Sequence, residues 1–150
     1  MYEEHRRRQS PDSTDWAIYS PNVPVFRIDD GTELELPWLL SFITWAAPYA
    51  PAIGQPQAGE LLRQRIHRVL AIAQAYAYAA LVLGEWGCGA FANEARRTAI
   101  DFRQALEHEY EGAFSEVVFA MADWSPERKF LGPFCDVFAA NSNGWRSKRS

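Results

Sequence analysis

The sequence predicts an α/β fold in which parallel strands alternate with helices. Three apolar runs, at residues 39–46, 80–83 and 116–122, have the length and composition of buried strands. Two long segments with apolar residues at helical spacing connect these runs. Crossovers of this length join parallel strands by right-handed connections, so the pattern indicates a parallel unit.

Composition restricts the class of protein. A chain of 150 residues with 48% hydrophobic and 23% charged residues is typical of one ordered globular domain. The net charge of -4 argues against a general nucleic-acid binder. No apolar run has the length of a membrane span, and the charged N-terminus lacks the apolar core of a signal peptide. Two distant cysteines favour reduced thiols and hence a cytoplasmic location.

A hairpin is predicted ahead of the parallel unit and would make the sheet mixed. Residues 16–19 and 23–28 are strand-like, with prolines in and between them, which predicts an edge strand or a bulge. Residues 29–31, Asp-Asp-Gly, are a hairpin turn signal, and residues 32–36 alternate as a return strand.

The first crossover helix is predicted over residues 60–79, after a loop at residues 48–59 that is rich in Pro, Gly and Ala. Arginines at positions 63, 65 and 68 are expected away from its apolar stripe. The stripe consists of Leu62, Ile66, Val69, Leu70, Ala73, Tyr76 and Ala77.

The second crossover helix is predicted from Asn93 to about Glu111. Gly112 stands where its C-terminus is expected, and a last helix is predicted over residues 130–140. The apolar stripe of the second helix is Ala99, Phe102, Leu106 and Tyr110.

A glycine-rich turn joins the strand at residues 80–83 to the second helix. It contains Gly84, Gly87 and Gly89, and Asn93 is expected to cap the helix. Glycines let the backbone approach a ligand closely, and free N–H groups at a helix start favour an anion. A purely structural turn without a ligand is the alternative interpretation of this pattern.

The sequence of this turn resembles that of a known family. Residues 83–93 read Leu-Gly-Glu-Trp-Gly-Cys-Gly-Ala-Phe-Ala-Asn, similar to Leu-Gly-Ala-Trp-Gly-Cys-Gly-Val-Phe-Gly-Asn in the phosphate loop of microbial-type poly(ADP-ribose) glycohydrolases. Residues 19–27 and 117–123 resemble two strands of the same family. Residues 42–48 resemble its Ile-Thr-x-x-Ala-Pro-Asn strand, with Tyr49 where Asn is usual.

The resemblance covers about residues 2–138 and implies a macrodomain-like, three-layer α/β/α fold with a mixed sheet. It divides the chain into a polar N-terminal segment (1–15), a partial macrodomain-like domain (16–140) and a polar tail (141–150). The family's first half, which holds the adenine-binding strand and a loop of three glycines followed by Gln-Glu-Glu, has no counterpart here. The only adjacent glutamates, Glu3 and Glu4, lie in a sequence that resembles the helix following that loop in the family. The resemblance therefore implies the C-terminal portion of the domain, without a catalytic residue.

The resemblance also assigns a binding site for the diphosphate and ribose of ADP-ribose. Phe91 is expected to pack on the distal ribose, with a core position at the helix start as the alternative. Ala90 and Ala92 stand where Val and Gly are usual, and the second replacement is expected to hinder close backbone approach. The expected ligand-binding residues are Gly87, Cys88, Gly89, Ala90, Phe91 and Asn93.

Residues at the ends of neighbouring strands are candidates for the rest of the pocket. Thr44, Ala46 and Ala47 end one strand, and Asp123 and Trp124 follow another, at the edge where open α/β sheets bind ligands. Structural packing is the alternative for these residues.

No catalytic residue and no metal site are predicted. Cys88 lies between two glycines before a helix, where a thiolate is favoured, but a nucleophilic cysteine needs a base. The histidines are scattered, at positions 5, 67 and 108, and form neither a base for Cys88 nor a metal-ligand set. Glu85 stands where the family commonly has Ala and is given no catalytic role.

Three functions follow as hypotheses. The first is a protein that binds ADP-ribose or ADP-ribosylated protein and has no hydrolase activity. It is expected to use no cofactor and to bind neither a membrane nor a specific nucleic acid. The second is a catalytically dead interaction module that pairs with itself or with a complementing chain through an exposed sheet edge. The third is a truncated gene whose complete form is the enzyme.

Overall fold

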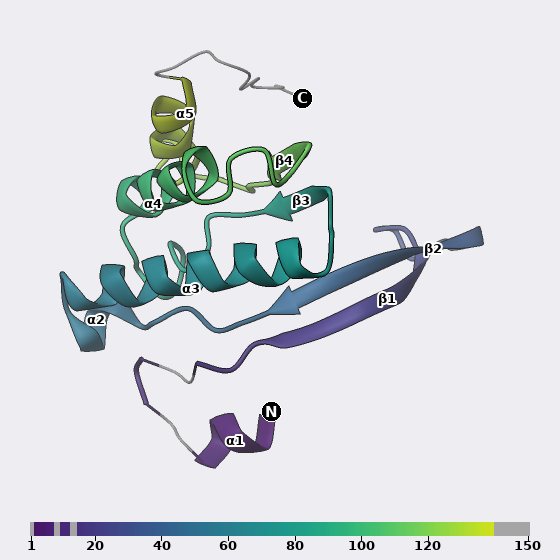
Figure 1. Ribbon diagram of the computed structural model, residues 1–150, viewed down its shortest axis with the longest axis horizontal. Coiled ribbons are helices and arrows are strands. Elements are labelled where there is room, and N and C mark those ends of the chain that lie inside the picture. The colour runs from purple at the N-terminus through teal and green to yellow at the C-terminus, as the bar shows by residue number, and fades with distance from the viewer. Residues whose placement is uncertain (1, 8–9, 13–14, 140–150) are drawn as a thin grey trace. The chain divides into compact units, whose positions relative to one another are not determined.

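The computed structural model describes residues 2–7, 10–12 and 15–139 (Figure 1). They form two compact units. Among the described residues, the hairpin unit contains 2–7 and 15–46, and the α/β unit contains 10–12 and 47–139.

The hairpin unit consists of helix α1 (Tyr2–Arg7) and the antiparallel strands β1 (Ile18–Arg27) and β2 (Glu33–Thr44). The predicted turn is confirmed: Ile28 N donates to Thr32 O at 3.0 Å, and the Thr32 N–H donates to the Asp30 carboxylate at 2.8 Å. The predicted bulge is also confirmed, since the ladder shifts register between Ser20 and Val23.

Strand β2 differs from the sequence prediction. Residues 32–36 and 39–46 are predicted as two strands, the second in the parallel sheet, but they form one strand that pairs with β1 in the described chain. Pro37 does not break it because the ladder is irregular there, between the pairs Val25–Trp38 and Arg27–Glu33. A proline at an irregularity has no ladder hydrogen bond to lose.

The α/β unit confirms the predicted fold class. Strands β3 (Ala80–Leu83) and β4 (Glu116–Phe119) pair in parallel, from Ala80 opposite Glu116 to Leu83 opposite Phe119. The predicted strand at 80–83 is confirmed in full. The helices are α2 (Ala50–Ile53), α3 (Gln57–Ala75), α4 (Ala95–Glu107) and α5 (Leu131–Ala139).

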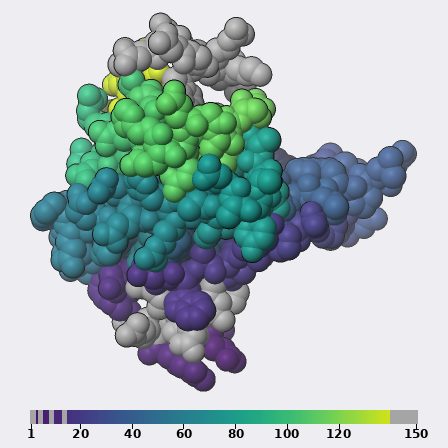
Figure 2. Space-filling model, viewed as in Figure 1, coloured from purple at the N-terminus to yellow at the C-terminus, as the bar shows by residue number. Residues whose placement is uncertain are grey.

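One face of the β3–β4 pair packs on the core. Leu81, Leu83, Val117 and Phe119 lie against it, because alternate side chains of a strand point to the same face. Helices α3 and α4 adjoin one another (Figure 1), and their segments form neighbouring parts of the molecular surface (Figure 2). They supply much of this core. The core consists of Ala47, Leu62, Ile66, Leu70, Ala99, Phe102, Ala105, Leu106, Phe134, Val137 and Phe138.

Helix α3 is displaced towards the N-terminus relative to its prediction. The segment predicted as a loop, 48–59, contains α2 and the first residues of α3. At the other end Tyr76 is exposed and Ala77 has φ +57°, so neither extends the apolar stripe. Arg65, predicted away from the stripe, is buried because its guanidinium donates to the carbonyl oxygen of Asp12.

Helix α4 is shorter than predicted, while its buried stripe of Ala99, Phe102 and Leu106 is confirmed. It begins at Ala95, with Glu94 at the N-cap position. The last helix is confirmed as α5. In the described residues no helix combines the length and apolar character needed to cross a membrane.

Candidate functional site

The loop between β3 and α4 requires glycine at Gly87. Its φ is +79°, in the left-handed region that favours glycine. An added Cβ would lie 2.7 Å from Ala47 Cβ and 2.8 Å from Asn93 Nδ2. The loop backbone is therefore packed directly on the segment that contains Ala47.

Asn93 holds the loop closed and is not the helix cap that the sequence predicts. Its side chain is only 5% exposed, and Nδ2 donates to Pro48 O at 2.9 Å and to Gly87 O at 3.0 Å. Its backbone N–H also donates to Gly87 O, at 2.9 Å. Because the amide is used across the loop, α4 starts without a side-chain cap.

Several N–H groups of the loop make no hydrogen bond within the described residues. Cys88 N donates to Glu85 O at 2.9 Å and Ala92 N to Gly89 O at 3.0 Å. The N–H groups of Gly87, Gly89, Ala90 and Phe91 donate to no acceptor in the part of the chain that the structure describes. Successive unpaired backbone N–H groups can bind an anion.

Ala92 occupies the position at which the resemblance expects glycine. Its φ is +50°, so the chain keeps a left-handed conformation there with an alanine. Such a conformation costs a non-glycine residue about 1–3 kcal/mol. The replacement therefore retains the positive φ at a cost in stability.

Phe91 lies on the surface of the loop beside Tyr49. It is 39% exposed, and its ring meets the Tyr49 ring edge to face, with centroids 6.2 Å apart and planes at 82°. Its carbonyl oxygen accepts a hydrogen bond of 3.0 Å from Ala50 N. The alternative of a core position for Phe91 does not fit this exposure.

Cys88 is a buried thiol. Burial raises its pKa to about 11; a hydrogen bond with Thr98 opposes this rise, and the Glu85 carboxylate adds a smaller contribution to it. The predicted preference for a thiolate is therefore wrong, because the solvation that a thiolate would lose on burial outweighs the stabilisation that the start of a helix would give it. Cys88 is protonated at neutral pH, which agrees with its having no nucleophilic role.

Asp123 caps helix α5 from the turn after β4. One carboxylate oxygen accepts from Phe130 N at 2.7 Å and Leu131 N at 2.8 Å. The other accepts from Ser125 N at 3.0 Å and Ser125 Oγ at 2.5 Å. The hydroxyl of Ser125 and these backbone N–H groups hold the pKa of Asp123 well below its usual range.

Solved structures of known function resemble this chain. A poly(ADP-ribose) glycohydrolase from Deinococcus radiodurans in complex with ADP-ribose is 42% identical, with a TM-score of 0.85 over 92% of this chain and 58% of that one. The glycohydrolase from Thermomonospora curvata is 40% identical, with a TM-score of 0.84 over 91% of this chain and 52% of that one. The chain is related to these bacterial poly(ADP-ribose) glycohydrolases. No protein-family model and no curated protein sequence matches it.

The relation to the glycohydrolases confirms the predicted resemblance and the macrodomain-like α/β fold. The Deinococcus enzyme in its apo form matches similarly, with 42% identity and a TM-score of 0.83. The chain spans a little over half the length of these relatives, between 52% and 59%.

The remaining predicted pocket residues are divided between the two units. Ala47 packs against the loop between β3 and α4, since its Cβ would lie 2.7 Å from a Cβ added at Gly87. Thr44 is exposed and Ala46 half-buried in the hairpin unit. Trp124 is 93% exposed after β4. A role of Thr44, Ala46 and Trp124 in a pocket stays a prediction.

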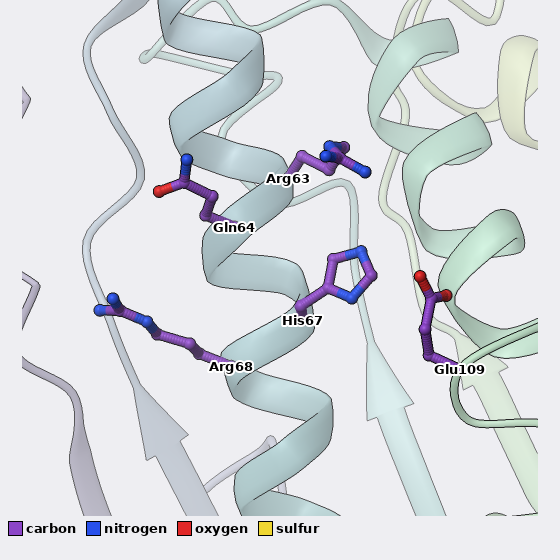
Figure 3. A pocket seen from close by; sticks show the side chains of 5 residues that line it. All are labelled: Arg63, Gln64, His67, Arg68 and Glu109. Carbon is purple, nitrogen blue, oxygen red and sulfur yellow. The ribbon is translucent and has the colours of Figure 1, made fainter.

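A hollow in the α/β unit is lined by none of the predicted site residues but by Arg63, Gln64, His67, Arg68 and Glu109. Figure 3 shows Arg63 and His67 pointing from α3 towards the side on which Glu109 lies, with Gln64 and Arg68 on the opposite side of the helix. The described residues contain no group of three or more His, Cys, Asp or Glu suited to a metal ion.

The sequence predicts no role for Tyr49, which the structure places against Phe91. The available signal was an aromatic residue at a position where the resembling family has Asn.

Proposed function

We propose that this chain binds ADP-ribose through the loop at residues 87–93. The observation that carries the proposal is the set of unpaired N–H groups at Gly87, Gly89, Ala90 and Phe91. They would receive the diphosphate, and the exposed ring of Phe91 would pack on the distal ribose. A related glycohydrolase solved with ADP-ribose supports this choice of ligand. Residues 16–140 would act as one partial macrodomain-like domain.

A thermal melt of the purified chain with and without ADP-ribose tests the proposal. Ligand at a hundredfold excess over the dissociation constant adds about 2.7 kcal/mol to the free energy of unfolding. For a chain of this size the expected rise in Tm is roughly 5–10 °C. Adenosine, which lacks the diphosphate, is the matched control and should leave the Tm unchanged. A cooperative melt that ADP-ribose does not shift would contradict the proposal.

The proposal includes no hydrolysis by this chain alone. The sequence has no run of three glycines followed by Gln-Glu-Glu, and no other carboxylate is assigned the role of a positioned acid. Incubation of the purified chain with poly(ADP-ribose) should release no ADP-ribose above background. Measurable release would show that another residue supplies the acid.

A second candidate function is an interaction module, whose partner would pair at an open edge of the β3–β4 sheet and cover its outer face. Val82 is 72% and Val118 44% exposed on that face. Parallel sheets are normally covered on both faces, and each of these strands pairs only with the other in the described chain. Each strand therefore has an edge without a partner strand among the described residues, and a second copy or a complementing chain would add a strand at that edge. Light scattering of the purified chain, alone and mixed with candidate partners, tests this function. A stable, folded monomer in both cases would count against an interaction module.

The compartment proposed for this protein is the cytoplasm. Both cysteines, Cys88 and Cys135, are free thiols, which a reducing compartment maintains.

A further inference from the structure

Tyr49 is held beside the proposed ADP-ribose loop by its own backbone. Its N–H donates to Pro11 O at 2.8 Å, and its carbonyl oxygen accepts from Ala52 N and Ile53 N, each at 3.2 Å. Both neighbours are tied to the loop as well. Pro48 O accepts from Asn93 Nδ2, and Ala50 N donates to Phe91 O.

These anchors leave the Tyr49 side chain facing outwards. Pro48 and Ala50 are buried, whereas Tyr49 is 43% exposed and touches the ring of Phe91 edge to face. Its hydroxyl makes no hydrogen bond within the described residues. The loop therefore presents an aromatic surface with a free hydroxyl, next to backbone N–H groups without partners.

From this arrangement we infer that Tyr49 is a ligand-contacting residue that recognises the nucleoside part of a nucleoside diphosphate. Its ring supplies a surface for a ribose or a base, and its hydroxyl supplies a hydrogen bond to a ribose hydroxyl or a base edge. The inference rests on the proposed function, since the diphosphate at residues 87–91 places the nucleoside within reach. It adds a side chain to a site otherwise built from backbone and Phe91.

Calorimetric titration with two probes tests the inference. ADP-ribose carries both the diphosphate and the nucleoside, whereas inorganic pyrophosphate carries the diphosphate alone. Tyr49→Ala should weaken ADP-ribose binding about tenfold, the scale of one lost aromatic stacking contact. Tyr49→Phe keeps the ring and should weaken it about threefold, the scale of one hydrogen bond. Neither variant should change pyrophosphate binding.

Tyr76→Ala is the matched control. Tyr76 is 57% exposed at the C-terminal end of α3. Helix α2, whose N-cap residue is Tyr49, lies near the other end of α3 (Figure 1). A 19-residue helix separates the two ends by about 28 Å. Tyr76→Ala should bind both probes like the wild type.

The outcomes separate this inference from the proposed function. Wild-type binding of ADP-ribose with an unchanged Tyr49→Ala variant overturns the inference and leaves the proposed function intact. An equal loss for both probes also overturns it, because Tyr49 would then support the loop and not contact the nucleoside. If the folded wild type binds neither probe, the proposed function fails and the inference fails with it. Tyr49→Phe preserves the ring packing, so it measures the contribution of the hydroxyl even where Tyr49→Ala does not fold.

Discussion

The turns that follow the two parallel strands differ in whether a carboxylate accepts hydrogen bonds from their backbone N–H groups. After β4, the Asp123 carboxylate accepts hydrogen bonds from the N–H groups of Ser125, Phe130 and Leu131. After β3, no described carboxylate accepts from the N–H groups of residues 87–91. Turns after parallel strands leave the same edge of a sheet, where open α/β folds bind ligands. One turn thus carries its own anion, and the other leaves its donors available for an anion from outside.

The largest effect is expected from filling the space at Gly87. In Gly87→Ala the new Cβ would overlap Ala47 and Asn93 at a φ of +79°. Overpacking and backbone strain together should cost about 2–5 kcal/mol in the free energy of unfolding and abolish the ADP-ribose shift. Urea denaturation and the thermal melt measure both.

Gly89→Ala is the control for the loop as a whole. Nothing lies within 4 Å of a Cβ at Gly89, and its φ is not positive. Its stability should stay within about 0.5 kcal/mol of wild type. Equal losses in Gly87→Ala and Gly89→Ala would show that the packing on Ala47 is not the cause.

A smaller loss is expected when the amide of Asn93 is removed. Asn93→Ala leaves the carbonyls of Pro48 and Gly87 without this donor in a buried site, which should cost about 1–3 kcal/mol. The midpoint of urea denaturation gives the value. Gln64→Ala, at an exposed amide on α3, should be neutral, and a neutral Asn93→Ala would contradict the role of Asn93 in closing the loop.

Asp123 should make stability depend on pH in the acid range. Its pKa is lowered in the folded state, so its contribution is complete above the unfolded pKa of about 3.8 and is lost as the pH falls from there through the lowered folded pKa. Asp123→Asn should be less stable than wild type at pH 7, and the difference should shrink below pH 4. Melts across pH 2–7 test this, and a difference that does not change with pH would exclude the carboxylate's charge as its source.

The smallest effect is expected at Cys88. Because its pKa is raised to about 11 and it is 3% exposed, a thiol reagent at pH 7.5 should label Cys135 well before Cys88. Single variants Cys88→Ser and Cys135→Ser assign the two rates by mass spectrometry. Fast labelling of Cys88 would mean that the β3–α4 loop opens readily in solution.

Local sequence patterns determined the elements and their order. The apolar run at 80–83 and the stripe of Ala99, Phe102 and Leu106 correspond directly to β3 and to the buried side of α4, because periodicity records which face a segment buries. The glycines of the loop were also recognisable, since few residues accept a positive φ such as that of Gly87.

Tertiary contacts decided what the individual polar side chains do. Asn93 has the sequence signature of a helix cap, yet its amide bridges the loop and the carbonyl of Pro48, 45 residues earlier in the chain. Arg65 is buried through the carbonyl of Asp12, 53 residues away, and Tyr49 meets Phe91 across the loop. A side chain's partner at such distances is set by how the elements pack, which local propensity does not encode. The sequence by itself therefore determined the α/β architecture and the position of the loop, and only the tertiary structure decided which of its polar groups are already paired and which are free for a ligand.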